Sequence, residues 1–218
     1  NYASSDRKNI VLGTSDYEVA HRFTFNFNYE LAWKENWETR VSLFGSANEG
    51  APYSYTFGRT AFFEFPNNSS NNLVYVPTGI DDPLISPNSN QAAVQALNDF
   101  IGANSDLSSQ RGQIAERNSA ADDWYTKFDL RLSQNLPGFM GTDRFQAFLV
   151  VENLGNLLND SWGIQREHGF PGSAELYNIS GVDAQNRYVI SSFNSSVDSD
   201  SIITGASLWN IRVGLKYD

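Results

Sequence analysis

The 218-residue chain has no cysteine, one methionine, two histidines and no long run of apolar residues. Without cysteine it can form neither a disulfide framework nor a thiolate metal site. A membrane-spanning helix needs roughly 18 consecutive apolar residues, so a helical membrane protein is excluded. The chain also has few basic residues, 15 against 25 acidic ones, for a net charge of −10. This balance argues against nucleic-acid binding.

Aromatic and aliphatic residues are concentrated at alternate positions of a few segments. In "RFTFNFNYELAW" (22–33) they alternate with mostly polar residues, which is the pattern of a β-strand with two unlike faces. The pattern recurs at residues 37–57, 122–134, 144–154 and 205–217, less cleanly in 144–154. Most of these segments have the roughly 9 to 11 residues with which a tilted strand crosses a bilayer. We therefore predict that each of these segments is one crossing strand.

The alternation also predicts which side chains would face lipid and which a polar lumen, if the strands belong to a membrane barrel. The expected lipid-facing residues are Phe25, Phe27, Phe128, Leu130, Ile211, Val213 and Leu215. The expected lumen-facing residues are Asn26, Asn28, Glu30, Lys127, Asp129, Arg131 and Arg212. Because Asp129 alternates with Lys127 and Arg131, we expect a ladder of salt bridges there rather than acid/base chemistry. A soluble β-sandwich also alternates and remains an alternative for any single strand.

Connections of two kinds separate the predicted strands. "KEN" and "NLPGFMGTD" are short, whereas residues of about 59–118 and 155–204 form long polar segments rich in Asn, Ser, Asp and Gly. Short turns at one end and long extracellular loops at the other are typical of outer-membrane barrels. Aromatic residues recur near the strand ends, where such barrels carry their interfacial girdles: Trp33, Trp37, Trp124, Trp209 and Tyr217.

Some regular structure is expected inside the long segments. "SNQAAVQALNDFIG" predicts a helix with Ser89 or Asn90 as its cap, one apolar face, and Gly102 as its stop. "ELYNI" and "RYVISSF" predict a hairpin around "SGVDAQN". We expect the helix to pack on the loop that contains it.

Six pieces of the sequence resemble one known family in the same order. They are "APYSYTF", "NNLVYVP", "ALNDFI", "GQIAERNSAADDWYTKFDLRLSQNLPG", "VVENLGNLLNDSWG" and "SLWNIRVGLKYD". These residues resemble the carboxy-terminal part of TonB-dependent outer-membrane receptors, most of all the Oar-like branch of Gram-negative bacteria. The resemblance extends over nearly the whole chain.

The resemblance implies a fold, a location and partners. The family fold is an antiparallel transmembrane β-barrel of about 22 strands with an amino-terminal plug that is gated by TonB. On this view residues 1–218 are the carboxy-terminal portion of one barrel domain in the outer membrane, with about its last five strands. Five strands cannot close a barrel, because the smallest have about eight. The expected partners are therefore the amino-terminal strands and plug, TonB through the plug, and the lipid bilayer.

The last strand carries a further expectation. Trp209 and Tyr217 lie on the apolar side of "SLWNIRVGLKYD", which resembles the terminal signal that the barrel-assembly machinery recognises in its clients. Family members typically end in Phe, so we expect one residue to follow Asp218. Any edge strand could also end in this way.

The residues give little support for an enzyme, a cofactor or a metal. His21 and His168 lie far apart and outside any cluster with ligand spacing. Asp81 with Asp82, or Asp198 with Asp200, could hold calcium in a loop, although such pairs are more often turn residues. The chain contains no nucleophile-elbow, phosphate-loop or HExxH motif. We predict no catalytic, cofactor-binding or metal-binding residues.

These residues and the resemblance leave three functional classes. The preferred one is part of a TonB-dependent transporter, whose barrel wall and surface loops serve the energy-gated passage of a substrate. The alternative is an outer-membrane adhesion or assembly module whose loops bind another surface protein. A self-contained barrel enzyme or porin is disfavoured by the number of strands.

Overall fold

The computed structural model describes residues 3–5, 12–35, 37–58, 72–140 and 143–217. The described chain is mostly β, with 47% strand and 13% helix, and its sheets are largely antiparallel. It divides into two compact units. Unit 1 consists of residues 1–18, 51–122 and 167–201, and unit 2 of residues 19–50, 123–166 and 202–218. The expected antiparallel β fold is confirmed at this level.

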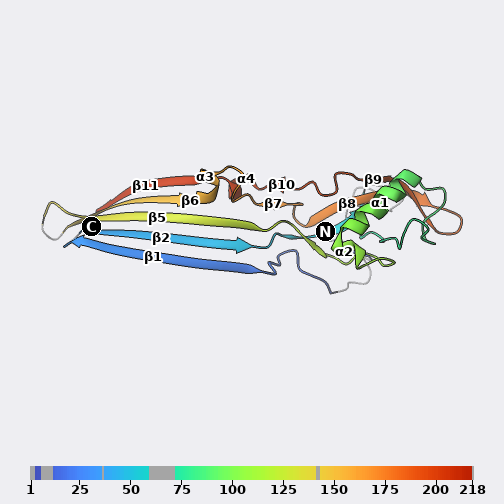
Figure 1. Ribbon diagram of the computed structural model, residues 1–218, viewed down its shortest axis with the longest axis horizontal. Coiled ribbons are helices and arrows are strands. Elements are labelled where there is room, and N and C mark those ends of the chain that lie inside the picture. Colours follow the sequence, from blue (N-terminus) through green and yellow to red (C-terminus); the bar gives the residue numbers. More distant parts are fainter. Residues whose placement is uncertain (1–2, 6–11, 36, 59–71, 141–142, 218) are drawn as a thin grey trace. The chain divides into compact units, whose positions relative to one another are not determined.

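Unit 2 is built on one antiparallel sheet of five strands, which run side by side in Figure 1. Their order is β1 (Arg22–Lys34), β2 (Trp37–Asn48), β5 (Tyr125–Pro137), β6 (Arg144–Glu152) and β11 (Asn210–Tyr217). Three of the five predicted strand segments form strands within about three residues of their predicted bounds. The segment predicted over 205–217 becomes a strand only from Asn210, because residues 204–207 form a short helix. Within the described residues the sheet does not close, because β1 and β11 each pair with one neighbour.

The second predicted strand is shorter than expected. We predicted one strand over residues 37–57, but β2 ends at Asn48 and β3 (Pro52–Phe57) belongs to another sheet. β3 is buried at every position and pairs in parallel with β8 (Gly172–Val182). Period two continues through "PYSYTF", so the sequence pattern alone does not reveal the change of sheet. The prediction of one strand to residue 57 was wrong for this reason.

Unit 1 has its own sheet and its own hydrophobic core. The sheet has the order β4 (Ala120–Ala121), β3, β8 and β9 (Tyr188–Phe193). The helix α1 (Gln91–Ala103) packs on β9, and α2 (Ser105–Ser108) follows it. The largest fully buried side chains are Tyr55, Tyr177, Leu97, Ile101, Leu107, Leu176 and Ile190. Much of what we expected to be long polar loops is thus folded around a core.

The predicted helix and hairpin are present. Asn90 caps α1 by accepting hydrogen bonds from the backbone N–H groups of Ala92 and Ala93, at 3.1 and 3.4 Å. The helix buries the face that contains Val94, Leu97 and Ile101, as predicted, and it ends at Ala103 rather than at Gly102. β8 and β9 form the predicted antiparallel hairpin.

The remaining elements are short. They are α3 (Leu154–Leu158), β7 (Arg166–Glu167), β10 (Ser201–Ile202) and α4 (Thr204–Ser207). Among the described residues, no helix combines the length and the apolar character needed to pass through a bilayer.

Candidate functional site

One face of the five-stranded sheet is apolar along all its strands. Strand pairing aligns residues of neighbouring strands in rows that cross the sheet, and alternate rows lie on the same face. One row consists of Phe27, Leu43, Leu130, Val151 and Ile211, and the next row on that face of Tyr29, Val41, Leu132, Leu149 and Val213. We call the face that contains these rows the apolar face. All seven residues expected to face lipid lie on it, namely Phe25, Phe27, Phe128, Leu130, Ile211, Val213 and Leu215.

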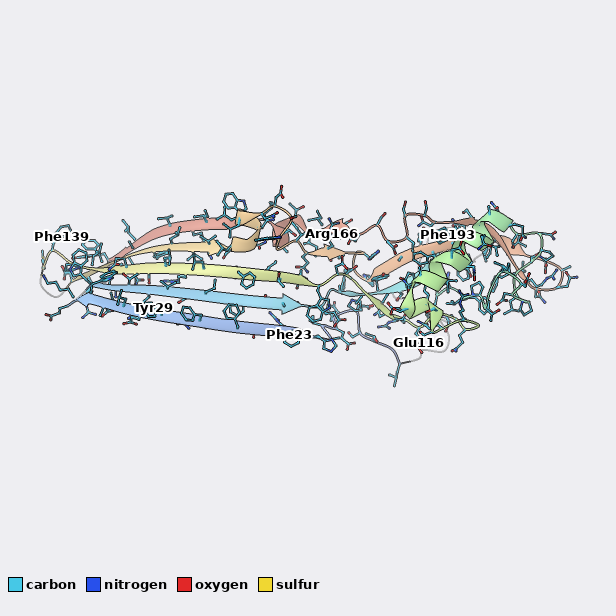
Figure 2. The ribbon with its side chains drawn as sticks, in the orientation of Figure 1. Phe23, Tyr29, Glu116, Phe139, Arg166 and Phe193 are labelled. Atoms are coloured by element: carbon cyan, nitrogen blue, oxygen red, sulfur yellow. The ribbon has the colours of Figure 1, made fainter. Side chains whose placement is uncertain are left out.

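Many side chains of the apolar face are exposed in the described chain, most of all on β1 and β11, whereas Val151 of β6 is buried. Val213 and Leu215 are 77% and 78% exposed, and Phe25 and Ile211 are exposed as well. Figure 2 shows Phe23 and Tyr29 standing out from β1. A contiguous exposed apolar surface of this kind usually marks contact with a partner or a membrane. The apolar face is therefore the main candidate functional surface of unit 2.

Close packing within the apolar face depends on Gly45. Gly45 pairs with Phe25 on one side and with Phe128 on the other. The Phe25 ring occupies the space that a Cβ at position 45 would need. A side chain here would displace the ring, so the glycine lets an aromatic side chain lie flat across the strand.

The opposite face, which we call the polar face, carries hydrogen bonds and ion pairs between strands. Arg40 of β2 pairs with Glu30 of β1 at 2.8 Å and with Glu38 at 3.2 Å. Arg212 of β11 pairs with Glu152 of β6. The seven residues expected to face a lumen all lie on this face: Asn26, Asn28, Glu30, Lys127, Asp129, Arg131 and Arg212.

The expected salt-bridge ladder along β5 takes a different form. Asp129 accepts a hydrogen bond from the backbone N–H of Asn153 at 2.8 Å, and the Lys127 ammonium donates to the carbonyl of Ala206. The Arg131 guanidinium lies 5.3 Å from the centre of the Phe148 ring. These three side chains contact neighbouring segments, so the polar side chains of β5 are held by contacts outside β5 and not by a ladder along it.

Aromatic residues lie at both ends of the sheet. At the end with the short turns, the Tyr217 ring lies 4.7 Å from that of Phe145, and its hydroxyl donates to Asp143 at 2.5 Å. At the other end, the Trp124 ring stacks on His21 and Phe23 at 6.2 and 6.0 Å. Trp209, just before β11, is 47% exposed. The aromatic residues Trp124, Trp209 and Tyr217 thus lie near the ends of strands, as the sequence predicts.

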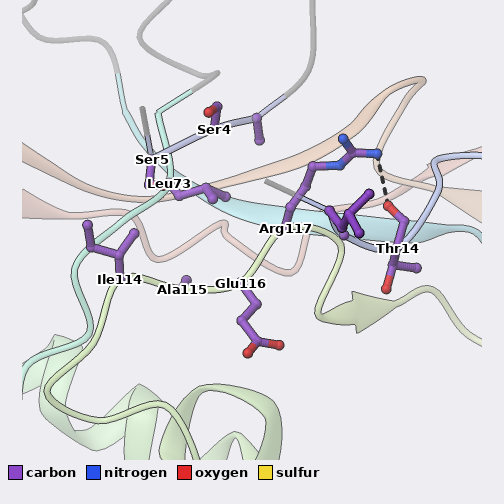
Figure 3. Close-up of a pocket in the computed structure, with 11 residues that line it drawn as sticks. Ser4, Ser5, Thr14, Leu73, Ile114, Ala115, Glu116 and Arg117 are labelled. Atoms are coloured by element: carbon purple, nitrogen blue, oxygen red, sulfur yellow. Dashed lines mark hydrogen bonds between the residues drawn. The ribbon is translucent and has the colours of Figure 1, made fainter. Parts of the chain in front are cut away.

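Unit 1 contains a polar pocket of about 380 Å³, drawn in Figure 3. Its lining includes Ser4, Thr14, Glu116 and Arg117. Arg117 donates to the carbonyl of Thr14 at 2.9 Å and lies 3.8 Å from the Asp16 carboxylate. These contacts hold two separate segments of unit 1 together, and they account for Arg117 as a structural residue.

Unit 1 also contains a buried histidine–aspartate pair that sequence spacing did not reveal. Nδ1 of His168 lies 2.6 Å from a carboxylate oxygen of Asp122, and Nε2 lies 3.3 Å from the carbonyl oxygen of Val197. The His168 ring stacks on Tyr53 at 4.1 Å, and the two paired side chains are almost fully buried. The hydrogen bond to Asp122 raises the pKa of His168 against the opposing effect of burial. Both ring nitrogens face acceptors, which favours the protonated imidazolium.

Asp82, from one of the two aspartate pairs that could hold calcium, has the contacts of a turn residue. It accepts hydrogen bonds from the backbone N–H groups of Thr78 and Leu84 at 2.7 Å, and from the hydroxyl of Tyr75 at 3.0 Å. Burial raises the pKa of Asp82, but these hydrogen bonds outweigh it and leave the pKa below its ordinary value. Within the described ranges, no three His, Cys, Asp or Glu side chains come together as a metal site.

Comparisons of the chain with family models, with curated proteins and with solved structures found no match.

Proposed function

We propose that the five-stranded sheet is part of the wall of a larger outer-membrane β-barrel in a Gram-negative bacterium. The observation that supports this most is the apolar face, which is continuous across the five strands and exposed at many of its positions in the described chain. A bilayer covers such a face on the outside of a barrel, while a polar face lines the inside. In a soluble sandwich the same face would be covered by a second sheet, and unit 2 has only one large sheet in its described part.

The open edges of the sheet support the same proposal. β1 and β11 are long strands that each have one paired edge in the described chain. An unpaired backbone N–H or C=O group in hydrocarbon costs several kcal/mol. In a membrane both edges therefore need further strands, and a barrel supplies them. Strands from the amino-terminal part of the barrel would pair with β1 and β11.

The transport function rests on the resemblance to TonB-dependent receptors. On this proposal the polar face lines the lumen, where Asn26, Asn28, Glu30 and Arg131 contact the plug or the path of the substrate. TonB acts through the plug, and the barrel-assembly machinery recognises the last strand. On this proposal the chain contributes the barrel wall and surface loops and catalyses no reaction.

Protease accessibility on intact cells tests the topology. The short turn between β5 and β6 would face the periplasm, and the long connections would face the medium. We would insert the same protease site either within residues 59–71 or after Gly138 in the full-length protein. The first site should be cut in intact cells, and the second only after the outer membrane is permeabilised. Cleavage after Gly138 in intact cells, with protection of the first site, would overturn the proposal.

Unit 1 favours the adhesion or assembly module as a second candidate function. Its segments fold around a core, as a protein-binding module does. A plug-coding region upstream in the gene would favour transport, and its absence would favour the module. TonB-dependent uptake of a substrate by cells that contain the protein would decide in favour of transport.

A further inference from the structure

A groove of about 330 Å³ opens on the apolar face of unit 2. Leu43 of β2 and Phe128 of β5 line it together with Leu154 and Leu158 of α3 and with Trp162. The sheet residues come from the apolar face, and the other residues follow the end of β6. The groove is therefore formed by two inner strands of the sheet and a short helix beside them.

The lining of the groove is almost wholly apolar. Among the described residues, no charged side chain lines it, and Thr126 provides its one side-chain hydroxyl. Leu158 and Trp162 are 69% and 56% exposed, so its walls are open. Each CH₂ group moved from water into such a site gains about 0.8 kcal/mol. The groove thus suits a hydrocarbon occupant and offers little to an ion or a polar solute.

Gly155 keeps the groove open. A Cβ at this position would lie 3.7 Å from Cβ of Trp162 and 3.9 Å from Oδ1 of Asn153, which are ordinary contact distances. Alanine would favour a helix more than glycine does, by up to about 1 kcal/mol. Because Gly155 is itself part of the lining, we expect a side chain much larger than alanine at this position to reduce the space in the groove. The space in the groove thus depends partly on the absence of a side chain at position 155.

The position of the groove limits what can cover it. β2 and β5 each have a paired neighbour on both sides, so strands added at β1 or β11 extend the sheet sideways and leave the groove uncovered. Its occupant must approach the apolar face from the front. Under the proposed function, on which this inference rests, the medium in front of that face is lipid. The groove also lies toward the sheet end from which the long connections leave, which is the outer end on that proposal.

We propose that the groove binds one acyl chain of an outer-leaflet lipid. A linear hydrocarbon chain fits a site with apolar walls, no charge and an opening to the bilayer. Trp162 stands beside the groove as an amphipathic side chain, as interfacial tryptophans do. The groove would then hold a lipid more tightly than the flat remainder of the apolar face.

The test uses the full-length protein that contains this chain, purified from outer membranes in mild detergent. Retained lipid is extracted and quantified by mass spectrometry for the wild type, Gly155→Phe and the matched control Gly155→Ala. We expect about one retained lipid per wild-type or Gly155→Ala protein. In Gly155→Phe retention should fall by about tenfold or more, which corresponds to the loss of two buried CH₂ groups. Equal retention in wild type and Gly155→Phe, or no retention in wild type, overturns the proposal.

A photo-crosslinking residue gives a second measurement in case Gly155→Phe fails to assemble. Placed at Leu158, it should capture lipid even after detergent purification, whereas at Val213 it should capture lipid only in the membrane. Capture of a protein at Leu158 would overturn the acyl-chain proposal in favour of a protein partner. If Val213 captures no lipid in the membrane, the proposed function itself fails. If Val213 captures lipid but Leu158 retains none after purification, only the groove inference fails.

Discussion

Placing a charge at Leu130 gives the sharpest test of the two faces. Leu130 lies near the middle of β5 and in one row with Leu43 and Val151 on the apolar face. If this face contacts lipid, Leu130→Arg puts a guanidinium into hydrocarbon. That change costs about 2 to 4 kcal/mol near the bilayer midplane, or roughly 30- to 1000-fold in the equilibrium between assembled and unassembled protein.

Arg131→Leu is the matched control, because it changes the neighbouring residue on the opposite face. It removes the contact of the guanidinium with the Phe148 ring, which is worth about 0.5 to 1 kcal/mol at an exposed site. We therefore expect this variant to assemble nearly as well as the wild type. The two substitutions exchange the same residue types across one strand, so composition alone cannot explain a difference between them.

Heat-modifiable mobility on gels measures the assembled fraction of the full-length protein in outer membranes. We expect the heat-modifiable band to be lost or strongly reduced in Leu130→Arg and retained in Arg131→Leu. Equal loss in both variants would mean that the two faces do not differ in their surroundings, lipid on one and water on the other. Loss in Arg131→Leu alone would reverse the assignment of the faces.

Three further predictions concern unit 1, each read by amide hydrogen exchange in the full-length protein. Leu97→Ala should destabilise its core by about 2 to 5 kcal/mol, because Leu97 is 1% exposed, and unchanged exchange over residues 91–103 would contradict this. Asn90→Ala should lower the stability of α1 by about 1 kcal/mol through loss of the helix cap. Asn90→Asp keeps a capping oxygen and should keep the amide protection of the helix. Equal protection in the two variants would argue against the cap. The pKa of His168 in the folded protein is raised above the unfolded value of about 6.5. The stabilisation of unit 1 by the protonated His168 is therefore complete below about pH 6.5 and is lost as the pH rises through the folded pKa. Protection of residues 167–201, corrected for intrinsic exchange, should thus fall with rising pH in the wild type and not in His168→Gln, and equal slopes would refute the role of the His168 pair with Asp122.

Much of unit 2 could be predicted from the sequence because it is built from local periodicity. A strand with one apolar face must alternate, and "RFTFNFNYELAW" does so without interruption. The short turns then fix which strands are antiparallel neighbours. The helix after Asn90 was predictable for a similar reason, since a capping residue followed by an apolar stripe is a local signal.

Unit 1 could not be predicted in the same way, because its contacts join distant segments. β3 pairs with β8 across more than a hundred residues, and no pattern within either strand specifies a parallel partner. The same holds for His168 and Asp122, which lie 46 positions apart. A lone histidine in a polar segment gives no sign that a carboxylate will be buried beside it.

The sequence by itself determined most strands of the sheet, their two unlike faces and the place of α1, because side-chain alternation and helix signals act over a few residues. The tertiary structure decided that the sheet order places β2 next to β5, that "PYSYTF" leaves the first sheet for another, and that the polar segments enclose a core. It also formed the groove beside Gly155, whose lining comes from β2, β5 and the segment after β6. Such features arise only when separate segments pack, since burial depends on which surfaces meet.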